Sequence, residues 1–142
     1  MMMRTAALFL CAAVGAAAMQ PAESVRTIDK GAQSNIDSAR QAVARNDAEL
    51  AALWKSHNYD KPAPKVDFSR EIVVAVFMGS RPTAGFSVEI LSAAERGGQM
   101  VVTYREKAPP ADALTAQVLT SPYHIAAIAK TEKPVVFTSS SR

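Results

Sequence analysis

The feature that most constrains this chain is an apolar run between Glu71 and Met78, with the sequence Glu-Ile-Val-Val-Ala-Val-Phe-Met. No polar side chain interrupts it after Glu71, and most of its residues favour extended backbone. A strand with one buried face alternates apolar and polar residues, whereas a continuous apolar run is typical of a strand covered on both faces. We therefore expect this run to form a central strand that is packed on both sides.

Other segments predict further strands around it. Residues 86–90 and 100–105 have the period of two expected of strands with one buried face. Arg96–Gln99, which reads Arg-Gly-Gly-Gln, predicts a hairpin turn between them, because glycine tolerates the positive φ that such turns need. Three shorter strands are expected at Val25–Lys30, Pro122–Ala129 and Val135–Thr138. These patterns predict an α+β fold, with a mainly antiparallel sheet of about five to seven strands, sandwich-like or open, and one main helix packed on it.

The helix is predicted from a start signal and a periodic apolar face. Asn46-Asp47-Ala48-Glu49 is a capping box, in which the Asn46 side chain accepts from the backbone N–H of Glu49 and Glu49 reaches back. Apolar positions then follow at i, i+3, i+4 and i+7, which defines one face of a helix of about three turns. We expect this face to lie on the sheet, with Trp54 as its anchor; it consists of Leu50, Leu53, Trp54 and His57.

Two segments remain ambiguous. The alanines of Ile36–Arg45 favour a helix, but Ile36 and Val43 fit a strand nearly as well. Leu114–Leu119, which follows the break at Pro109-Pro110, is interpreted as either extended or a short helix.

The N-terminus resembles an export signal. A single early charge on Arg4 precedes the alanine-rich run Ala6–Ala18, which ends in small residues, so we expect residues 1–18 to be a signal peptide cleaved after Ala18. Leu10 directly before Cys11 does not fit a lipoprotein signal. We expect residues 19–24 to be a mobile N-terminus and residues 25–142 to be a single domain, periplasmic or secreted, with no transmembrane segment once the signal is removed.

Composition excludes several classes of function. Cys11 is the only cysteine, so the mature domain is expected to have no disulfide, thiol nucleophile or zinc ribbon. Lys+Arg 16 against Asp+Glu 13 gives a net charge of +3, and these charges are scattered, so we expect no nucleic-acid partner.

The catalytic and metal-binding patterns are weak. His57 and His124 stand apart in sequence, so a metal site would require them to converge from distant elements. Ser121, His124 and Asp112 could be imagined as a triad, but no nucleophile elbow accompanies them. No phosphate-binding glycine loop or dinucleotide fingerprint is present. We therefore expect no enzyme activity, no cofactor and no metal.

The connection Gly79–Phe86, Gly-Ser-Arg-Pro-Thr-Ala-Gly-Phe, is the strongest candidate for a recognition loop. Pro82 fixes its own φ and favours an extended backbone at Arg81, and Gly85 permits a φ that other residues resist. Such a loop is stiff, and a stiff loop loses little entropy on docking. The alternative is that Arg81 braces the domain by pairing with Glu89 or Asp67.

A family resemblance is spread over segments within about residues 50–138: Trp54–His57, Val66–Ser69, Ile72–Phe77, Gly79–Ile90, Val101–Glu106, Pro109-Pro110 and Thr120–His124. Taken in order, these segments resemble the C-terminal domain of the protease complex subunit PrcB family of exported bacterial proteins. The loop of that family usually reads Gly-x-Arg-Pro-Thr-Gly-Gly-Tyr. Ala84 and Phe86 depart from this pattern, and Phe86 lacks the hydroxyl of a tyrosine.

The resemblance implies an exported, non-enzymatic domain that binds another exported protein. An accessory subunit of a secreted or envelope protease complex is the form of that role suggested by the family's name. No residue is carried over as catalytic. We expect the protein-binding loop to comprise Arg81, Pro82, Thr83, Gly85 and Phe86, with Tyr123 as a nearby aromatic residue.

Two other functions stay open. Residues 82–86 are similar to the Asn-Pro-Thr-Thr-Gly-Tyr loop of chagasin-like cysteine protease inhibitors, with Arg81 in place of the asparagine. An inhibitor-like module would act through the Arg81–Phe86 loop. A purely structural domain would use Arg81 only to hold its own fold together.

Overall fold

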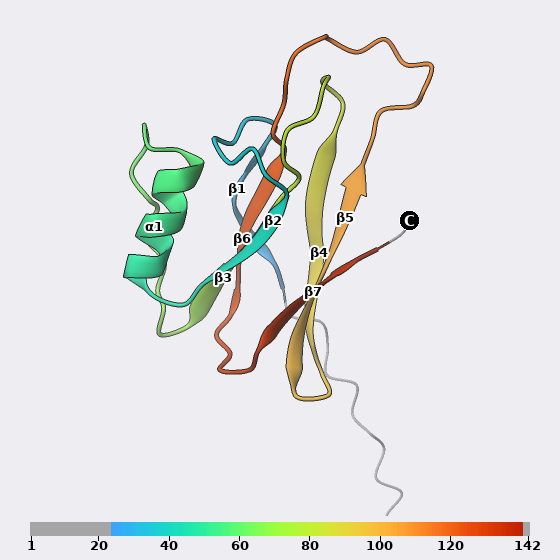
Figure 1. Cartoon of the computed structure of the whole chain (residues 1–142). Coiled ribbons are helices and arrows are strands. Elements are labelled where there is room, and N and C mark those ends of the chain that lie inside the picture. The colour runs from blue at the N-terminus through green and yellow to red at the C-terminus, as the bar shows by residue number, and fades with distance from the viewer. Residues whose placement is uncertain (1–23, 141–142) are drawn as a thin grey trace, which may run out of the picture.

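The computed structural model describes residues 24–140. The expected signal peptide at residues 1–18, and all but the last residue of the expected mobile N-terminus, lie outside the described residues. The elements are β1 (Arg26–Gly31), β2 (Arg40–Ala44), α1 (Asp47–His57), β3 (Glu71–Phe77), β4 (Ser87–Arg96), β5 (Gln99–Lys107), β6 (Tyr123–Ala129) and β7 (Val135–Ser139). They confirm the α+β class (Figure 1).

The strands form two sheets. The larger sheet has the order β1-β6-β3-β2, with every neighbouring pair antiparallel. The smaller sheet has the order β4-β5-β7. Its β4–β5 hairpin turns at Gly97 and Gly98, whose φ values of 56° and 78° agree with the predicted turn.

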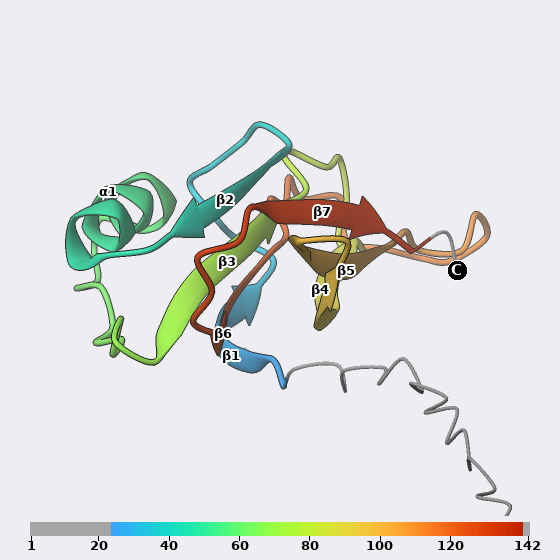
Figure 2. The same cartoon turned by 90° about the horizontal axis from the view of Figure 1, so that it is seen from below.

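The smaller sheet also contains a parallel pair, β5 with β7. The chain leaves β6 in the larger sheet, crosses between the sheets through residues 130–134 and enters β7 in the direction of β5. Figure 2 shows the chain crossing from the end of β6 to the start of β7, with β7 beside β5. Taken together, the two sheets are therefore mainly antiparallel, as expected, and β5 with β7 is the parallel pair.

Strand β3 is the centre of the fold, as its apolar run predicts. Its even-numbered residues, such as Val74 and Val76, face a core shared with the smaller sheet. Its odd-numbered residues, such as Val73 and Phe77, face a second core beneath α1. The alternation of a pleated strand thus places one set of side chains in each core, and the molecule has three layers: helix, larger sheet and smaller sheet.

Helix α1 begins where the capping box predicts. The Asn46 side chain accepts from the N–H of Glu49 at 2.8 Å, and its amide donates back to the Glu49 carboxylate at 3.1 Å. Its buried residues are the four predicted ones, Leu50, Leu53, Trp54 and His57. Among residues 24–140 no helix is long and apolar enough to cross a membrane.

The structure resolves both ambiguous segments. Residues 40–44 form β2, an edge strand paired with β3, so the tertiary pairing outweighs the helix propensity of the alanines. Leu114–Leu119 is neither helix nor strand, and runs irregularly between β5 and β6.

Candidate functional site

The Gly79–Phe86 loop joins β3 of the larger sheet to β4 of the smaller one and is held by the chain around it. At its start, Ser80 N–H donates to the Asp37 carbonyl at 2.9 Å. Gly79 has φ +77°, and a Cβ there would meet the backbone N of Ala39 at 2.7 Å. A side chain at Gly79 would therefore force the 37–39 backbone to move.

The middle of the loop is hydrogen-bonded to the segment that precedes β6. Arg81 and Thr120 exchange backbone hydrogen bonds at 2.7 and 2.9 Å, which makes a short antiparallel bridge. The Thr120 hydroxyl donates to the Thr83 carbonyl at 2.9 Å, and Ala84 N–H donates to the Ala116 carbonyl at 3.0 Å. These four contacts fix the loop on residues 116–120, so its predicted stiffness has a tertiary cause in addition to Pro82.

Gly85 is required at the end of the loop. Its φ is +95°, a region that residues with a Cβ rarely occupy. A Cβ would also lie 2.8 Å from the Cβ of Pro109 and 3.3 Å from the Cγ2 of Thr115. The loop and residues 108–120 are thus in close contact along their length.

The Arg81 side chain has no carboxylate partner among residues 24–140. The alternative, in which Arg81 pairs with Glu89 or Asp67, is not found in this part of the chain. Glu89 lies beside Arg105 at 3.6 Å, and Asp67 lies beside Arg70 at 3.8 Å. Glu89 is thus paired with a cation of the neighbouring strand β5, and Asp67 with a cation of its own turn.

The Arg81 guanidinium instead lies over the ring of Phe86, with 5.7 Å between its Cζ and the ring centroid. The Nε atom is buried and has no hydrogen-bond partner. A cation–π contact leaves the positive charge without a counter-ion. Arg81 is half-buried, so this charge remains within reach of an acceptor from outside the domain.

The segment that covers the loop exposes large apolar side chains. Leu114 is fully exposed, Leu119 is 74 % exposed and Val118 is 49 % exposed. In Figure 1 this segment passes over one end of the molecule, beside the connection from β3 to β4. We call the exposed and half-exposed residues at this end the apical surface: Arg81, Pro82, Gly85, Leu114, Val118 and Leu119.

The predicted loop residues do not all contribute to this surface. Pro82 and Gly85 are exposed, whereas the Thr83 hydroxyl turns inward and donates to the Ala84 carbonyl at 3.0 Å. Phe86 is half-buried against the core between the sheets. Tyr123 lies apart, because its ring is buried in the core under α1.

Tyr123 belongs to a buried polar row that the sequence does not reveal. The His57 ring lies 4.2 Å from the Tyr123 ring, and its Nε2 lies 3.1 Å from a carboxylate oxygen of Asp29. The other nitrogen, Nδ1, lies 2.8 Å from the Ser34 Oγ. Burial, and then the hydrogen bond to Asp29, raise the pKa of the Tyr123 hydroxyl above its ordinary value.

Ser34, His57 and Asp29 are the residue types of a catalytic triad, but the Ser34 oxygen is buried and already hydrogen-bonded. Ser34 is 9 % exposed, and its oxygen already accepts from the Ile36 N–H at 3.1 Å. A nucleophile needs an exposed oxygen with space for a substrate beside it. The row therefore stabilises the end of α1 against β1.

The conceivable triad of Ser121, His124 and Asp112 does not form. Both nitrogens of the His124 ring are engaged elsewhere, with Nδ1 accepting from the Ile90 N–H at 2.8 Å and Nε2 lying 2.8 Å from the Thr27 hydroxyl. Across residues 24–140 no group of three or more His, Cys, Asp or Glu side chains could hold a metal ion.

Sequence analysis missed Leu114, Val118 and Leu119. An apolar residue is ordinarily assigned to the core, and only the position of this segment outside both sheets shows that these are exposed. The signal that could have found them is the length of the irregular connection after Pro109-Pro110, because long connections without secondary structure are commonly functional.

Comparison with known proteins gives one match. The family model described as PrcB C-terminal matches residues 72–129, from β3 through the Gly79–Phe86 loop and the apical segment to β6. No curated protein and no solved structure matches the chain. This match confirms the predicted resemblance to the PrcB C-terminal family over residues 72–129.

Proposed function

We propose that this chain is an exported, non-enzymatic domain that binds another exported protein through its apical surface. The specific form of the proposal is an accessory subunit of a secreted or envelope protease complex, which is the role that the family's name suggests. The signal-like N-terminus supports export.

The observation that carries the proposal is the exposure of Leu114, Val118 and Leu119 on the segment that is hydrogen-bonded to the loop of Arg81, whose side chain has no counter-ion among residues 24–140. Exposed apolar side chains that gather on one surface commonly mark a protein interface. Arginine is also enriched in interface cores, where it supplies directional hydrogen bonds beside apolar contacts.

Rigidity supports the same proposal. The loop is held by backbone hydrogen bonds to Asp37, Ala116 and Thr120, so its conformation exists before any partner arrives. A surface that is already ordered loses less entropy on association, so more of the contact energy appears as affinity.

The inhibitor-like alternative is less well supported. A loop that blocks a protease cleft must project into it, whereas the Arg81–Phe86 loop lies flat against residues 116–120. The purely structural alternative, in which Arg81 holds the fold together, lacks a carboxylate pair among residues 24–140 and is supported only by the contact of Arg81 with Phe86.

Affinity capture from an envelope fraction tests the proposal. Wild type, Arg81→Ala and the double variant Leu114→Ser/Leu119→Ser are used as baits, with Val136→Thr in β7 as a matched control. Val136 is 37 % exposed and lies in another part of the fold.

We expect wild type and Val136→Thr to capture the same exported protein, and both apical variants to lose most of it. Equal capture by all four baits would remove the apical surface from the account. Loss with Val136→Thr alone would move the interface to β7.

A further inference from the structure

Trp54 carries a hydrogen-bond donor that the domain does not use. The residue is 6 % exposed, and its indole Nε1 is buried with no hydrogen-bond partner. A buried indole N–H usually has an acceptor, and leaving one unpaired costs roughly 1–3 kcal/mol. A phenylalanine would pack in such a core without this cost, so the unpaired donor calls for an explanation.

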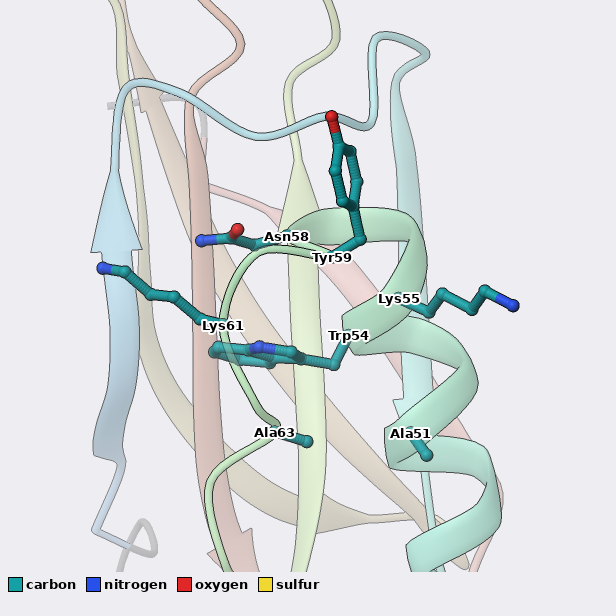
Figure 3. Close-up of a pocket in the computed structure, with 7 residues that line it drawn as sticks. All are labelled: Ala51, Trp54, Lys55, Asn58, Tyr59, Lys61 and Ala63. Atoms are coloured by element: carbon teal, nitrogen blue, oxygen red, sulfur yellow. The ribbon is translucent and has the colours of Figure 1, made fainter.

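A pocket that Trp54 helps to line lies at the C-terminal end of α1. It encloses about 340 Å³ and is lined by Ala51, Trp54, Lys55, Asn58, Tyr59, Lys61 and Ala63. Figure 3 shows Trp54 between the helix and the chain at residues 61–63, with the turn that carries Asn58 and Tyr59 next to it. This size is at the lower end of the range for small-molecule sites.

The lining is apolar at its base and positive at its rim. Trp54, Ala51 and Ala63 provide apolar contact area, whereas Lys55 and Lys61 are the only charged residues of the lining. Both lysines are exposed, and neither makes a salt bridge within residues 24–140. In Figure 3 both lysine side chains point away from Trp54, and the flexible four-carbon stem of a lysine can adopt other rotamers.

We propose that this pocket binds a small carboxylate with an apolar body, of the size of an aryl-acetate or of the last residue of a peptide. The carboxylate accepts the Trp54 indole N–H and pairs with Lys61, and the apolar body lies on Ala51, Ala63 and the indole. To reach the buried Nε1, the ligand displaces the side chains of the turn at residues 58–61, which are exposed or half-buried. This site is separate from the apical surface and does not depend on it.

The chain offers a specific probe, because Trp54 is its only tryptophan. The full chain labelled with ¹⁵N therefore shows a single indole resonance. We expect phenylacetate to move this resonance downfield in a saturable way, with a Kd of about 1 mM or tighter. The neutral isostere phenylacetamide should bind much more weakly. A short peptide that ends in phenylalanine, compared with its C-terminal amide, shows whether the carboxylate is a free acid or a chain end.

Two variants separate the contribution of the Trp54 indole N–H to ligand binding from that of the lysine charges. Trp54→Phe keeps the apolar base and removes the N–H, so ligand-observed NMR should show about tenfold weaker binding. Lys55→Gln/Lys61→Gln should weaken binding by about threefold or more, whereas Lys65→Gln, outside the pocket, should not change it. Thermal melting of Trp54→Phe, which loses buried packing area as well as the unpaired donor, checks that the variant folds.

Binding of either carboxylate probe with these variant effects supports the proposal. Absence of a saturable shift with both probes at 50 mM would overturn it, as would equal affinity for the acid and the amide. Neither outcome bears on capture through the apical surface.

Discussion

His124 links the two sheets in a form that depends on its being neutral. It is 2 % exposed, and its Nδ1 accepts from the backbone N–H of Ile90 on the edge strand β4. Protonation would place a hydrogen on Nδ1 and turn this hydrogen bond into a repulsive contact. Burial, and then the charge of Lys30, lower the pKa of His124 to about 4, against a smaller opposing effect of Glu89.

The lowered pKa predicts a loss of stability in acid. In the unfolded chain the imidazole takes up its proton near its ordinary pKa of 6.5, whereas in the folded chain it does so near 4. The stabilisation is thus fully present above pH 6.5 and is lost as the pH falls from 6.5 to about 4. At 1.36 kcal/mol per pKa unit, the loss from this group is about 3 kcal/mol, most of it above pH 4.5.

Urea denaturation at pH 7.5, 6.5, 5.5 and 4.5 measures the free energy of unfolding. The control is His124→Asn, whose side-chain oxygen can accept from Ile90 N–H without titrating. We expect the variant to be less stable than wild type at pH 7.5 by roughly 1–2 kcal/mol, because the contact with Thr27 is lost. Its decline toward pH 4.5 should be smaller than that of wild type by about 2–3 kcal/mol. Parallel pH profiles for the two proteins would refute the reasoning.

Three further predictions concern stability and are read from urea midpoints. Gly85→Ala should lower the free energy of unfolding by about 2–3 kcal/mol, because φ is +95° and the new Cβ would meet Pro109. Gly97→Ala, whose Cβ would enter open space, should lower it by only about 1 kcal/mol. Equal losses in the two variants would contradict this reasoning. Arg45→Ala should cost about 2 kcal/mol, since its guanidinium donates to the Thr131 and Lys133 carbonyls and ties β2 to the crossing between the sheets; a change below about 0.5 kcal/mol would show that the link is dispensable. Leu114→Ser/Leu119→Ser should change stability by less than about 0.5 kcal/mol, and a larger loss would mean that these side chains pack in the fold.

Much of the fold can be predicted from the sequence because the relevant signals are local. The capping box lies within four residues, and the hairpin at Gly97 and Gly98 depends on the backbone freedom of adjacent glycines. The double burial of β3 is visible because an uninterrupted apolar run leaves no polar face for solvent. The direction of β7 has no such signal, because it is set by the route of residues 130–134 between the sheets.

The candidate site was predicted only in part. The stiff loop could be predicted from Pro82 and Gly85. The partner of the Arg81 side chain could not, because it depends on which acids lie nearby after folding. Glu89 is near Arg81 in sequence, yet the pairing of β4 with β5 places it beside Arg105. The polar row of Ser34, His57 and Asp29 joins segments far apart in the chain, and no spacing rule could have identified it.

The central claim is that a partner protein docks on the apical surface, and site-specific photo-crosslinking in the cells that make this protein tests it most directly. A photoreactive residue is placed at Leu114, which is fully exposed, and in a parallel strain at Val136 in β7. We predict that position 114 crosslinks to one exported polypeptide, and that Arg81→Ala reduces the yield of that product. No crosslinked product at position 114, or the same product from both positions, would contradict the claim.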